Sequence, residues 1–435
     1  MDIIEFIEMK KNNQPLSKKE IDFIIDEYKN GKIDDQSILE FMKTVNHKNF
    51  SYEETYYLAD ALARTGDMLN LYKEVGDIVD KHNVGAYSDS STLIYMSVLA
   101  TIGVKNVRVL SKCYGQFRST LERLEVFKGF NAKVSKERLI DIIKMIGAGV
   151  IEETGNIAPV DKKLYALRKE ADLISIPLIA SSILAQKIAT GSNTVIYDVK
   201  AGEGAIAGDE KSANELAKFL VESSKLAGFN AAAIITNLDQ PLGSGLGIRA
   251  EIEEMITALR SERSLYGSNL IDVARELVVD ALCLTGFAKG RNEATNMFED
   301  AILSGKALDK FREIIREYDA VYEDFKHTSS RLLDNVAISY ITSKENGYVN
   351  DINIKHLVEG YKNLAGDGKK KQDKNASVVL LIKEGAKVSY GDKLVRIFYS
   401  LDNQSFFKAI IPIRDAIKIS GAKPHIHKIF YKIVL

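Results

Sequence analysis

The sequence predicts an α/β protein with a small all-helical lobe, a larger α/β domain with a mixed, mostly parallel sheet, and a C-terminal α+β domain. Three observations lead to this prediction. Residues 1–65 show helical periodicity, with Ser-x-x-Glu capping boxes that start at Ser17 and Ser51. After residue 66, strand-like segments alternate with helices, which is typical of a parallel sheet. From about residue 331, strand–turn–strand patterns replace this alternation.

Two predicted helices between residues 154 and 191 interrupt the strand–helix alternation. We expect them to pack with the N-terminal helices, which would leave a cleft between the helical lobe and the α/β domain. At 435 residues the chain is too long for one ordinary core. The predicted domains are 1–65 plus 156–191 for the helical lobe, 66–155 plus 192–330 for the α/β domain, and 331–435 for the C-terminal domain.

Composition narrows the classes of function. The apolar fraction of 46%, the charged fraction of 27% and the net charge of -1 describe a globular protein without an electrostatic footprint for nucleic acid or an anionic membrane. Two cysteines provide no disulfide framework, which favours a cytoplasmic location. The N-terminus lacks a signal-peptide pattern, and no apolar run reaches the roughly 18 residues of a membrane-spanning helix.

A first candidate loop, DKHNVGAYSDSST (80–92), lies where a predicted strand ends and a helix begins. Lys81, Thr92 and backbone amides near the helix start could hold a phosphate there, because open sheets bind ligands at the carboxyl ends of their strands. The simpler interpretation is an ordinary turn with a solvated lysine.

A second candidate loop, SKCYGQFRSTLERLE (111–125), follows the next predicted strand. Ser111 and Thr120 supply hydroxyl groups, and Arg118 supplies a bidentate anion donor. Helix capping by Ser119 or Thr120 is the simpler interpretation of this loop alone. Two neighbouring loops of this kind together favour an anion site.

The helices between residues 154 and 191 carry polar side chains at helical spacing. Tyr165 and Arg168 are three residues apart, and Ser182 and Gln186 are four apart, so each pair shares one helix face. These side chains suit a flat ring with hydrogen-bonding edges. We therefore expect them, Arg168 included, to face the cleft.

Other motifs are weaker. The GxGxxxG pattern of residues 198–208 follows a strand, but the acidic residue that a dinucleotide site requires at the end of the next strand is missing. A dinucleotide-binding oxidoreductase is therefore a minor alternative. His425 and His427 alternate on a predicted C-terminal strand without an acidic or cysteine partner nearby, so they do not predict zinc.

Several segments together resemble the pyrimidine-nucleoside and thymidine phosphorylases. They are TGNIAPVDKKLYALR, SIPLIASSILAQKIATG, YDVKAGEGA and QPLG, and the similarity covers essentially the whole chain. The resemblance implies that phosphate attacks C1′ of a pyrimidine nucleoside and releases the base and a pentose 1-phosphate. It also implies a homodimer that closes its lobes over nucleoside and phosphate, with phosphate as co-substrate and no other cofactor required.

The resemblance assigns roles residue by residue. The phosphate-binding positions are Lys81, Asn83, Thr92, Ser111 and Thr120, in the α/β domain. The base-binding positions are Tyr165, Arg168, Ser182 and Gln186, with His82 beside them. His82 and Arg168 are the catalytic candidates, because they would stabilise negative charge on the departing pyrimidine. Some members bind a monovalent or divalent cation at positions that resemble Leu242, Gly245 and Glu254.

The sequence departs from the family at two places. Gln186 replaces a lysine that contacts the base, and losing a charge-assisted hydrogen bond of about 1.5–3 kcal/mol would slow turnover by roughly one to two decades. The 111–120 loop lacks most of the family's glycines, which let the backbone approach phosphate. Phe117 and Arg118 would either narrow the phosphate pocket or supply a new anion contact.

Two functions therefore stay open. One is phosphorolysis, at an ordinary or a slow rate, of thymidine, deoxyuridine or uridine, where the apolar Val109 leans towards deoxynucleosides. The other is a paralogue that binds a nucleoside or another ligand without turnover.

Overall fold

The computed structural model describes residues 2–85, 91–111, 119–239, 241–262, 269–322, 335–366, 373 and 375–435. The centre of the 111–120 loop, with Phe117 and Arg118, lies outside the described residues. Within the described residues, no helix is long and apolar enough to cross a membrane.

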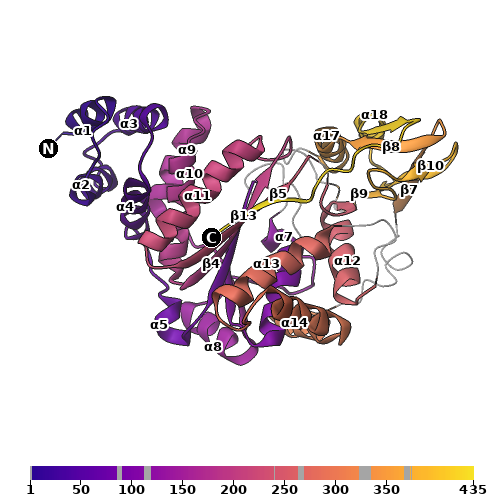
Figure 1. Ribbon diagram of the computed structural model, residues 1–435, viewed down its shortest axis with the longest axis horizontal. Helices are drawn as coiled ribbons and strands as arrows, with labels where there is room; N and C mark the ends of the chain where they lie inside the picture. Colours follow the sequence, from indigo (N-terminus) through magenta and orange to yellow (C-terminus); the bar gives the residue numbers. More distant parts are fainter. Residues whose placement is uncertain are drawn as a thin grey trace.

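A six-stranded sheet forms the centre of the molecule (Figure 1). Its strand order is β13-β5-β4-β1-β2-β3, in which β13 is antiparallel to its neighbour and the other strands are parallel. The predicted α/β class with a mixed, mostly parallel sheet is thereby confirmed. The strands are β1 Val79–Val84, β2 Asn106–Leu110, β3 Ala148–Glu152, β4 Thr194–Ala201, β5 Asn230–Asn237 and β13 Phe430–Val434.

Helices cover both faces of this sheet because its inner strands are apolar on both sides. In β4, Val195, Tyr197 and Val199 belong to one core, whereas Ile196 belongs to the other. The first face packs on α8 (Lys136–Ile146) and α11 (Glu210–Leu226), and beyond them on the helical lobe. The second face packs on α6 Ser91–Ile102, α7 Thr120–Leu124, α12 Ile248–Leu259, α13 Leu270–Leu284, α14 Arg291–Leu303 and α15 Lys306–Glu317.

The helical lobe brings together segments that are distant in sequence. Its N-terminal helices are α1 Ile3–Lys11, α2 Lys18–Lys29, α3 Asp35–Lys48 and α4 Tyr52–Ala63, and α5 Leu71–Val75 leads into the sheet. Helix α9 (Pro159–Glu170) packs on α3 and α4, and α10 (Ile176–Thr190) packs on α4 and α11 (Figure 1). Residues 156–191 therefore lie against the N-terminal helices. The domain boundaries drawn from the sequence stay a prediction.

The capping box predicted at Ser51 is present, and its Glu54 carboxylate also binds residues of the first helix and the loop after it. The amide of Glu54 donates to Ser51 Oγ at 3.2 Å, while Ser51 N donates to a Glu54 carboxylate oxygen at 2.9 Å. The same carboxylate accepts from Lys10 Nζ at 2.9 Å and from Leu16 N at 2.8 Å. This buried ion pair joins α1 to α4.

The C-terminal part contains two small sheets. One has the order β6-β9-β11-β7 and the other the order β10-β8-β12. The elements are β6 Gly245–Leu246, β7 Val336–Thr342, β8 Gly347–Ile352, α17 Ile354–Ala365, β9 Ser377–Leu380, β10 Lys387–Val388, β11 Lys393–Ser400, α18 Phe406–Asp415 and β12 Ile417–Ser420.

The last strand does not stay with this C-terminal part. After β12 the chain returns to the centre of the molecule, where β13 pairs with β5 (Figure 1). Tyr431 and Val434 pack against one core of the central sheet, while Phe430 and Ile433 pack against the other. A strand that is apolar on both sides is suited to a sheet covered on both faces, which explains why β13 leaves the predicted C-terminal domain.

Candidate active site

The candidate site lies at the carboxyl end of the central sheet, where β1 and β4 are neighbours. Strand β1 leads into α6 on one face, whereas β4 leads into α11 on the opposite face. Such a change of side leaves a crevice beyond the strand ends, and ligands bind there in open α/β sheets. Lys81, His82 and Asn83 lie on β1, and Ser111 directly follows β2.

One side of β1 forms the anion side of the site. Lys81 is completely buried, and its Nζ donates to Ser91 Oγ at 3.1 Å, to Thr92 Oγ1 at 3.0 Å and to Asn83 Oδ1. Asn83 Nδ2 donates to Thr92 Oγ1 at 3.0 Å. Ser91 and Thr92 begin α6, whose N-terminus adds a partial positive charge. An ammonium, a carboxamide and two hydroxyl groups thus gather where an anion could bind.

A second buried lysine lies close to this group. Lys200 Nζ donates to both oxygens of the Asp198 carboxylate at 2.7 Å, and Thr236 Oγ1 donates to the same group at 2.8 Å. Lys81 Nζ is 3.7 Å from Asp198 Oδ2, and all four residues are fully buried. Two ammonium groups thus lie beside one carboxylate, an arrangement that favours a nearby anion. The sequence analysis missed Asp198 and Lys200 because they lie within a motif that was considered for its glycines.

The other side of β1 faces α10. Asp80, which is fully buried, accepts from Lys187 Nζ at 2.8 Å and from Arg108 Nη1 at 3.2 Å. Burial lowers the pKa of His82 well below its usual value, and the positive charges of Lys187, Arg108 and Lys81 lower that pKa further. The His82 imidazole is therefore neutral near pH 7. It can donate one hydrogen bond to a departing base, but it brings no positive charge.

Helices α9 and α10 position the predicted base-binding residues. Ser182 Oγ donates to Asp161 Oδ2 at 2.6 Å. The guanidinium carbon of Arg168 lies 5.8 Å from the centre of the Tyr165 ring, which is 54% exposed. Arg168 itself is only 6% exposed, so little of its side chain is open to solvent, and its place at the cleft stays a prediction. Burial lowers the pKa of Arg168, and the charge of Asp161 opposes that shift.

Asp161 is a functional candidate that the sequence analysis missed. Burial raises the pKa of its carboxyl group, whereas Arg168 and the Ser182 hydroxyl act in the opposite direction. Its position one residue before the KKLYALR segment is the only signal that the sequence offered.

Gln186 lies half-buried on α10, one turn after Ser182. The next residue, Lys187, is 1% exposed and is directed to Asp80. Lys187 therefore does not replace the family lysine that is missing at position 186.

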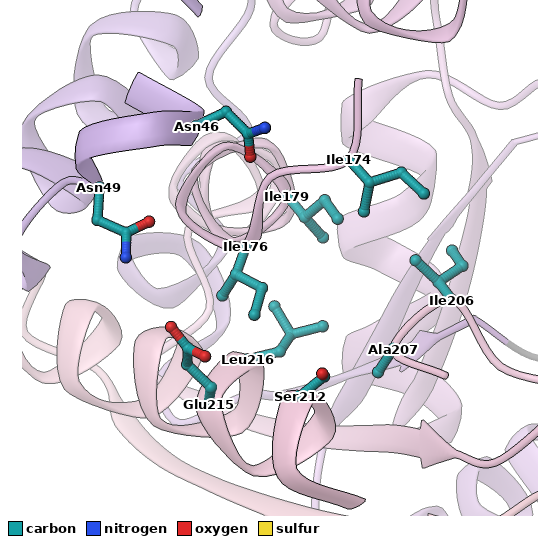
Figure 2. A pocket seen from close by; sticks show the side chains of 10 residues that line it. All are labelled: Asn46, Asn49, Ile174, Ile176, Ile179, Ile206, Ala207, Ser212, Glu215 and Leu216. Carbon is teal, nitrogen blue, oxygen red and sulfur yellow. The ribbon is translucent and has the colours of Figure 1, made fainter. Parts of the chain in front are cut away.

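A pocket of about 250 Å³ lies next to these residues (Figure 2). Ile174 lies in the segment before α10, and Ile179 lies in the first turn of that helix. Ile206 and Ala207 come from the loop after β4. Ile179 precedes Ser182 by three residues and Gln186 by seven, so the three side chains share one side of α10. The remaining lining residues are Asn46, Asn49, Ile176, Ser212, Glu215 and Leu216.

Gly85 connects this pocket to the anion side. Its φ of +76° lies in the left-handed region, and a Cβ atom there would approach Ile206 N to 2.9 Å. The glycine therefore lets the end of β1 pack directly against the loop that lines the pocket.

The second predicted anion loop is only partly described. Ser111 Oγ donates to Glu153 Oε2, and Glu153 directly follows β3. Ser119 caps α7, because its Oγ accepts from Glu122 N at 3.3 Å. The capping interpretation thus holds for Ser119. Thr120 is buried in the first turn of α7, and its phosphate contact stays a prediction.

The predicted cation positions are engaged in local hydrogen bonds. Glu254 accepts from Ser244 N at 2.8 Å and from Gly245 N at 3.2 Å, and Leu242 O accepts from Asn269 N at 2.9 Å. The searched part of the chain contains no group of three or more metal-ligating His, Cys, Asp or Glu residues. Because backbone amides already occupy the Glu254 carboxylate, these residues fit a cation poorly.

The two C-terminal histidines differ from the prediction. Residues 425 and 427 lie before β13 rather than on a strand. His427 Nδ1 lies 2.8 Å from an oxygen of Glu384, which is buried, so the expectation of no acidic partner is wrong for His427.

Comparison with known proteins identifies the class. Residues 75–308 match the glycosyl transferase family, a/b domain. The anthranilate phosphoribosyltransferase of Thermus thermophilus has a similar fold, with a TM-score of 0.59 at 13% sequence identity, over 74% of this chain and 100% of that one. The family match places the chain in the glycosyl transferase family, and the structural likeness shows a shared fold.

Curated relatives narrow the family. The chain is 32% identical over 413 residues to the pyrimidine-nucleoside phosphorylase of Geobacillus stearothermophilus, with 92% of each sequence covered. It is 34% identical over 316 residues to the enzyme of the same name from Staphylococcus haemolyticus, with 72% of each covered. The chain belongs to the pyrimidine-nucleoside phosphorylase family, and the resemblance seen in the sequence is confirmed.

Proposed function

We propose that this chain catalyses phosphorolysis of a pyrimidine nucleoside. Phosphate oxygen forms a bond to C1′, the bond between C1′ and the base nitrogen breaks, and its electron pair leaves with the base. The products are the free pyrimidine and a pentose 1-phosphate. The observation that carries the proposal is the division of β1: Lys81 and Asn83 point to the anion side, and Asp80 and His82 point towards α10.

The hydrogen bonds of the base side favour uracil or thymine over cytosine. Because Ser182 gives its only hydroxyl proton to Asp161, its oxygen has lone pairs left to accept a hydrogen bond. Arg168 is a pure donor. Uracil and thymine present an N3–H donor between two carbonyl acceptors, whereas N3 of cytosine is an acceptor. The proposed substrates are therefore thymidine, deoxyuridine or uridine.

The pocket beside α10 suits the apolar part of such a ring. Ile174, Ile179 and Ile206 line it (Figure 2). Tyr165 on α9 offers a largely exposed aromatic face. We propose that the ring edge binds Ser182 and Arg168 while these apolar groups hold its plane.

Catalysis would then rest on positioning and electrostatics. Lys81, Asn83 and Thr92 would orient phosphate against C1′. Arg168 would stabilise the negative charge that develops on the base, and the neutral His82 would donate one hydrogen bond to it. No step in this scheme uses a metal ion.

Three observations favour a second candidate, a relative that binds a nucleoside without turnover. The hydroxyl of Ser111 is engaged by the Glu153 carboxylate, Gln186 lacks the charge of the family lysine, and the 111–120 sequence is poor in glycine. The cytoplasmic location predicted from the cysteine content and the homodimer implied by the resemblance also stay predictions.

The deciding experiment measures free base released from uridine, deoxyuridine and thymidine, with and without inorganic phosphate. We expect phosphate-dependent release together with formation of pentose 1-phosphate. Binding of both phosphate and uracil without any release would instead support the second candidate. A failure to bind uracil would contradict both.

A further inference from the structure

Glu153 has no role in the scheme above, although it lies beside Ser111 at the carboxyl end of the sheet. Its backbone N–H donates to Leu110 O at 2.8 Å, which extends the pairing of β2 with β3 by one residue. Its carboxylate accepts the proton of Ser111 Oγ. The side chain is thus fixed at the carboxyl end of the sheet, next to a predicted phosphate ligand.

The electrostatic neighbours of Glu153 lie on the base side. Its negative charge contributes to the raised pKa of Asp161, and it acts to raise the pKa of Lys187 on α10. Asp161 in turn holds the hydroxyl of Ser182. Glu153 therefore reaches from Ser111, on the anion side, towards the residues that would hold the base.

The geometry of the reaction places the pentose between the anion side and the base side of the site. In a nucleoside C1′ carries the base, and the attacking phosphate approaches C1′ from the other side, so the sugar lies between the two half-sites. A carboxylate repels phosphate, which argues against a role in binding the nucleophile. It accepts hydrogen bonds only, and it has lone pairs beyond the one used by Ser111. Sugar hydroxyl groups are the donors that match it.

We propose that Glu153 binds a pentose hydroxyl of the nucleoside and so sets the sugar specificity of the site. This inference rests on the proposed function, because it takes a nucleoside as the ligand. Ser111 holds the carboxylate in position for this contact. A charge-assisted hydrogen bond of this kind corresponds to roughly a tenfold to hundredfold difference in affinity between sugars with and without the hydroxyl.

The test compares uridine, 2′-deoxyuridine, 3′-deoxyuridine and uracil by calorimetric titration. In the native chain, removing the contacted hydroxyl should weaken binding about tenfold or more. Glu153→Ala should abolish that difference and leave the affinity for uracil unchanged. Glu153→Gln, which keeps one acceptor oxygen, should give an intermediate difference, and it also serves if the alanine variant does not fold.

Glu152→Gln is the matched control. It removes a neighbouring carboxylate that points to the opposite side of β3, so the sugar preference should stay as in the native chain. An unchanged hydroxyl dependence in both Glu153 variants would overturn the proposal, as would a native chain that binds all three nucleosides equally. Altered uracil binding in Glu153→Ala, in either direction, would also overturn it, because Glu153 would then act on the base side. These outcomes test nucleoside binding alone. The proposed phosphorolysis is tested separately, by whether free base is released.

Discussion

Replacing Lys81 by methionine should separate phosphate binding from folding. The change removes the hydrogen bonds from Lys81 to Asn83, Ser91 and Thr92. The Asp198 carboxylate, however, keeps both hydrogen bonds from Lys200 at 2.7 Å and the one from Thr236. Around that carboxylate, only the longer approach of Lys81, at 3.7 Å, is lost. Losing the Lys81 hydrogen bond to phosphate should weaken phosphate binding by about 1.5–3 kcal/mol, or roughly tenfold to hundredfold.

Lys200→Met is the matched control for this variant. It removes the two short hydrogen bonds to Asp198 and leaves a buried carboxylate with a distant ammonium group. Breaking a buried ion pair in this way destabilises a protein by about 3–5 kcal/mol. We therefore expect Lys200→Met to lower the free energy of unfolding more than Lys81→Met, and Lys81→Met to lower phosphate affinity more.

Three measurements check this pair of variants. They are calorimetric titration with inorganic phosphate, the phosphate KM of base release, and the midpoint of urea unfolding. Phosphate affinity in Lys81→Met equal to that of the native chain would refute the anion site on β1. Equal losses of stability in the two variants would refute the claim that Lys200, rather than Lys81, is the main ion-pair partner of Asp198.

Three further predictions follow from the base side and the loops. Arg168→Ala should weaken uracil binding by about 1.5–3 kcal/mol in calorimetry and, because Arg168 is buried beside Asp161, should also lower the melting temperature; unaltered uracil affinity would remove its role. Uracil affinity should fall as pH decreases through the raised pKa of Asp161, because the protonated group no longer takes the Ser182 proton, and Asp161→Asn should flatten that pH profile. The same raised pKa means that the contribution of Asp161 to stability is present at low pH and is lost as pH rises through it, which pH-dependent unfolding can check. Gly85→Ala should cost about 1–3 kcal/mol of stability in urea unfolding, because of its positive φ and the nearby Ile206 backbone.

The sequence predicted those features that depend on local pattern. Helix caps, the alternation of strands and helices, and the position of Ser111 at a strand end all follow from spacing along a few residues. Lys81 differs from the prediction, because β1 continues past it to Val84. The family motifs added the expectation that α9 and α10 bind the base, which stays a prediction.

The partners inside the site could not be predicted from the sequence. Lys187 meets Asp80 across 107 positions, and Ser182 meets Asp161 across 21. The first contact depends on how the helical lobe is placed on the sheet, and the second on how α9 packs against α10; no local pattern specifies either. Burial adds a second difficulty, since Arg168 has the spacing of a cleft residue and is nevertheless covered.

The distribution of charge around β1 connects these contacts to the proposed reaction. On one side, Lys81 and Lys200 lie beside the carboxylate of Asp198; on the other, Lys187 and Arg108 lie beside that of Asp80. Each of these two carboxylates therefore has two buried cations beside it. During phosphorolysis negative charge moves from the attacking phosphate to the departing base, so cations on both sides of C1′ stabilise the beginning and the end of that transfer.

The same charges explain why the residue between them is neutral. The cations that favour the two anions also lower the pKa of His82, so a positively charged imidazole would be disfavoured in this position. The charge on the departing base is then left to Arg168, because a guanidinium group keeps its positive charge in proteins although burial lowers its pKa here. On this reasoning His82→Asn, which keeps a neutral donor, should slow base release far less than Arg168→Ala. Equal losses of rate in the two variants would show that His82 acts as a cation after all.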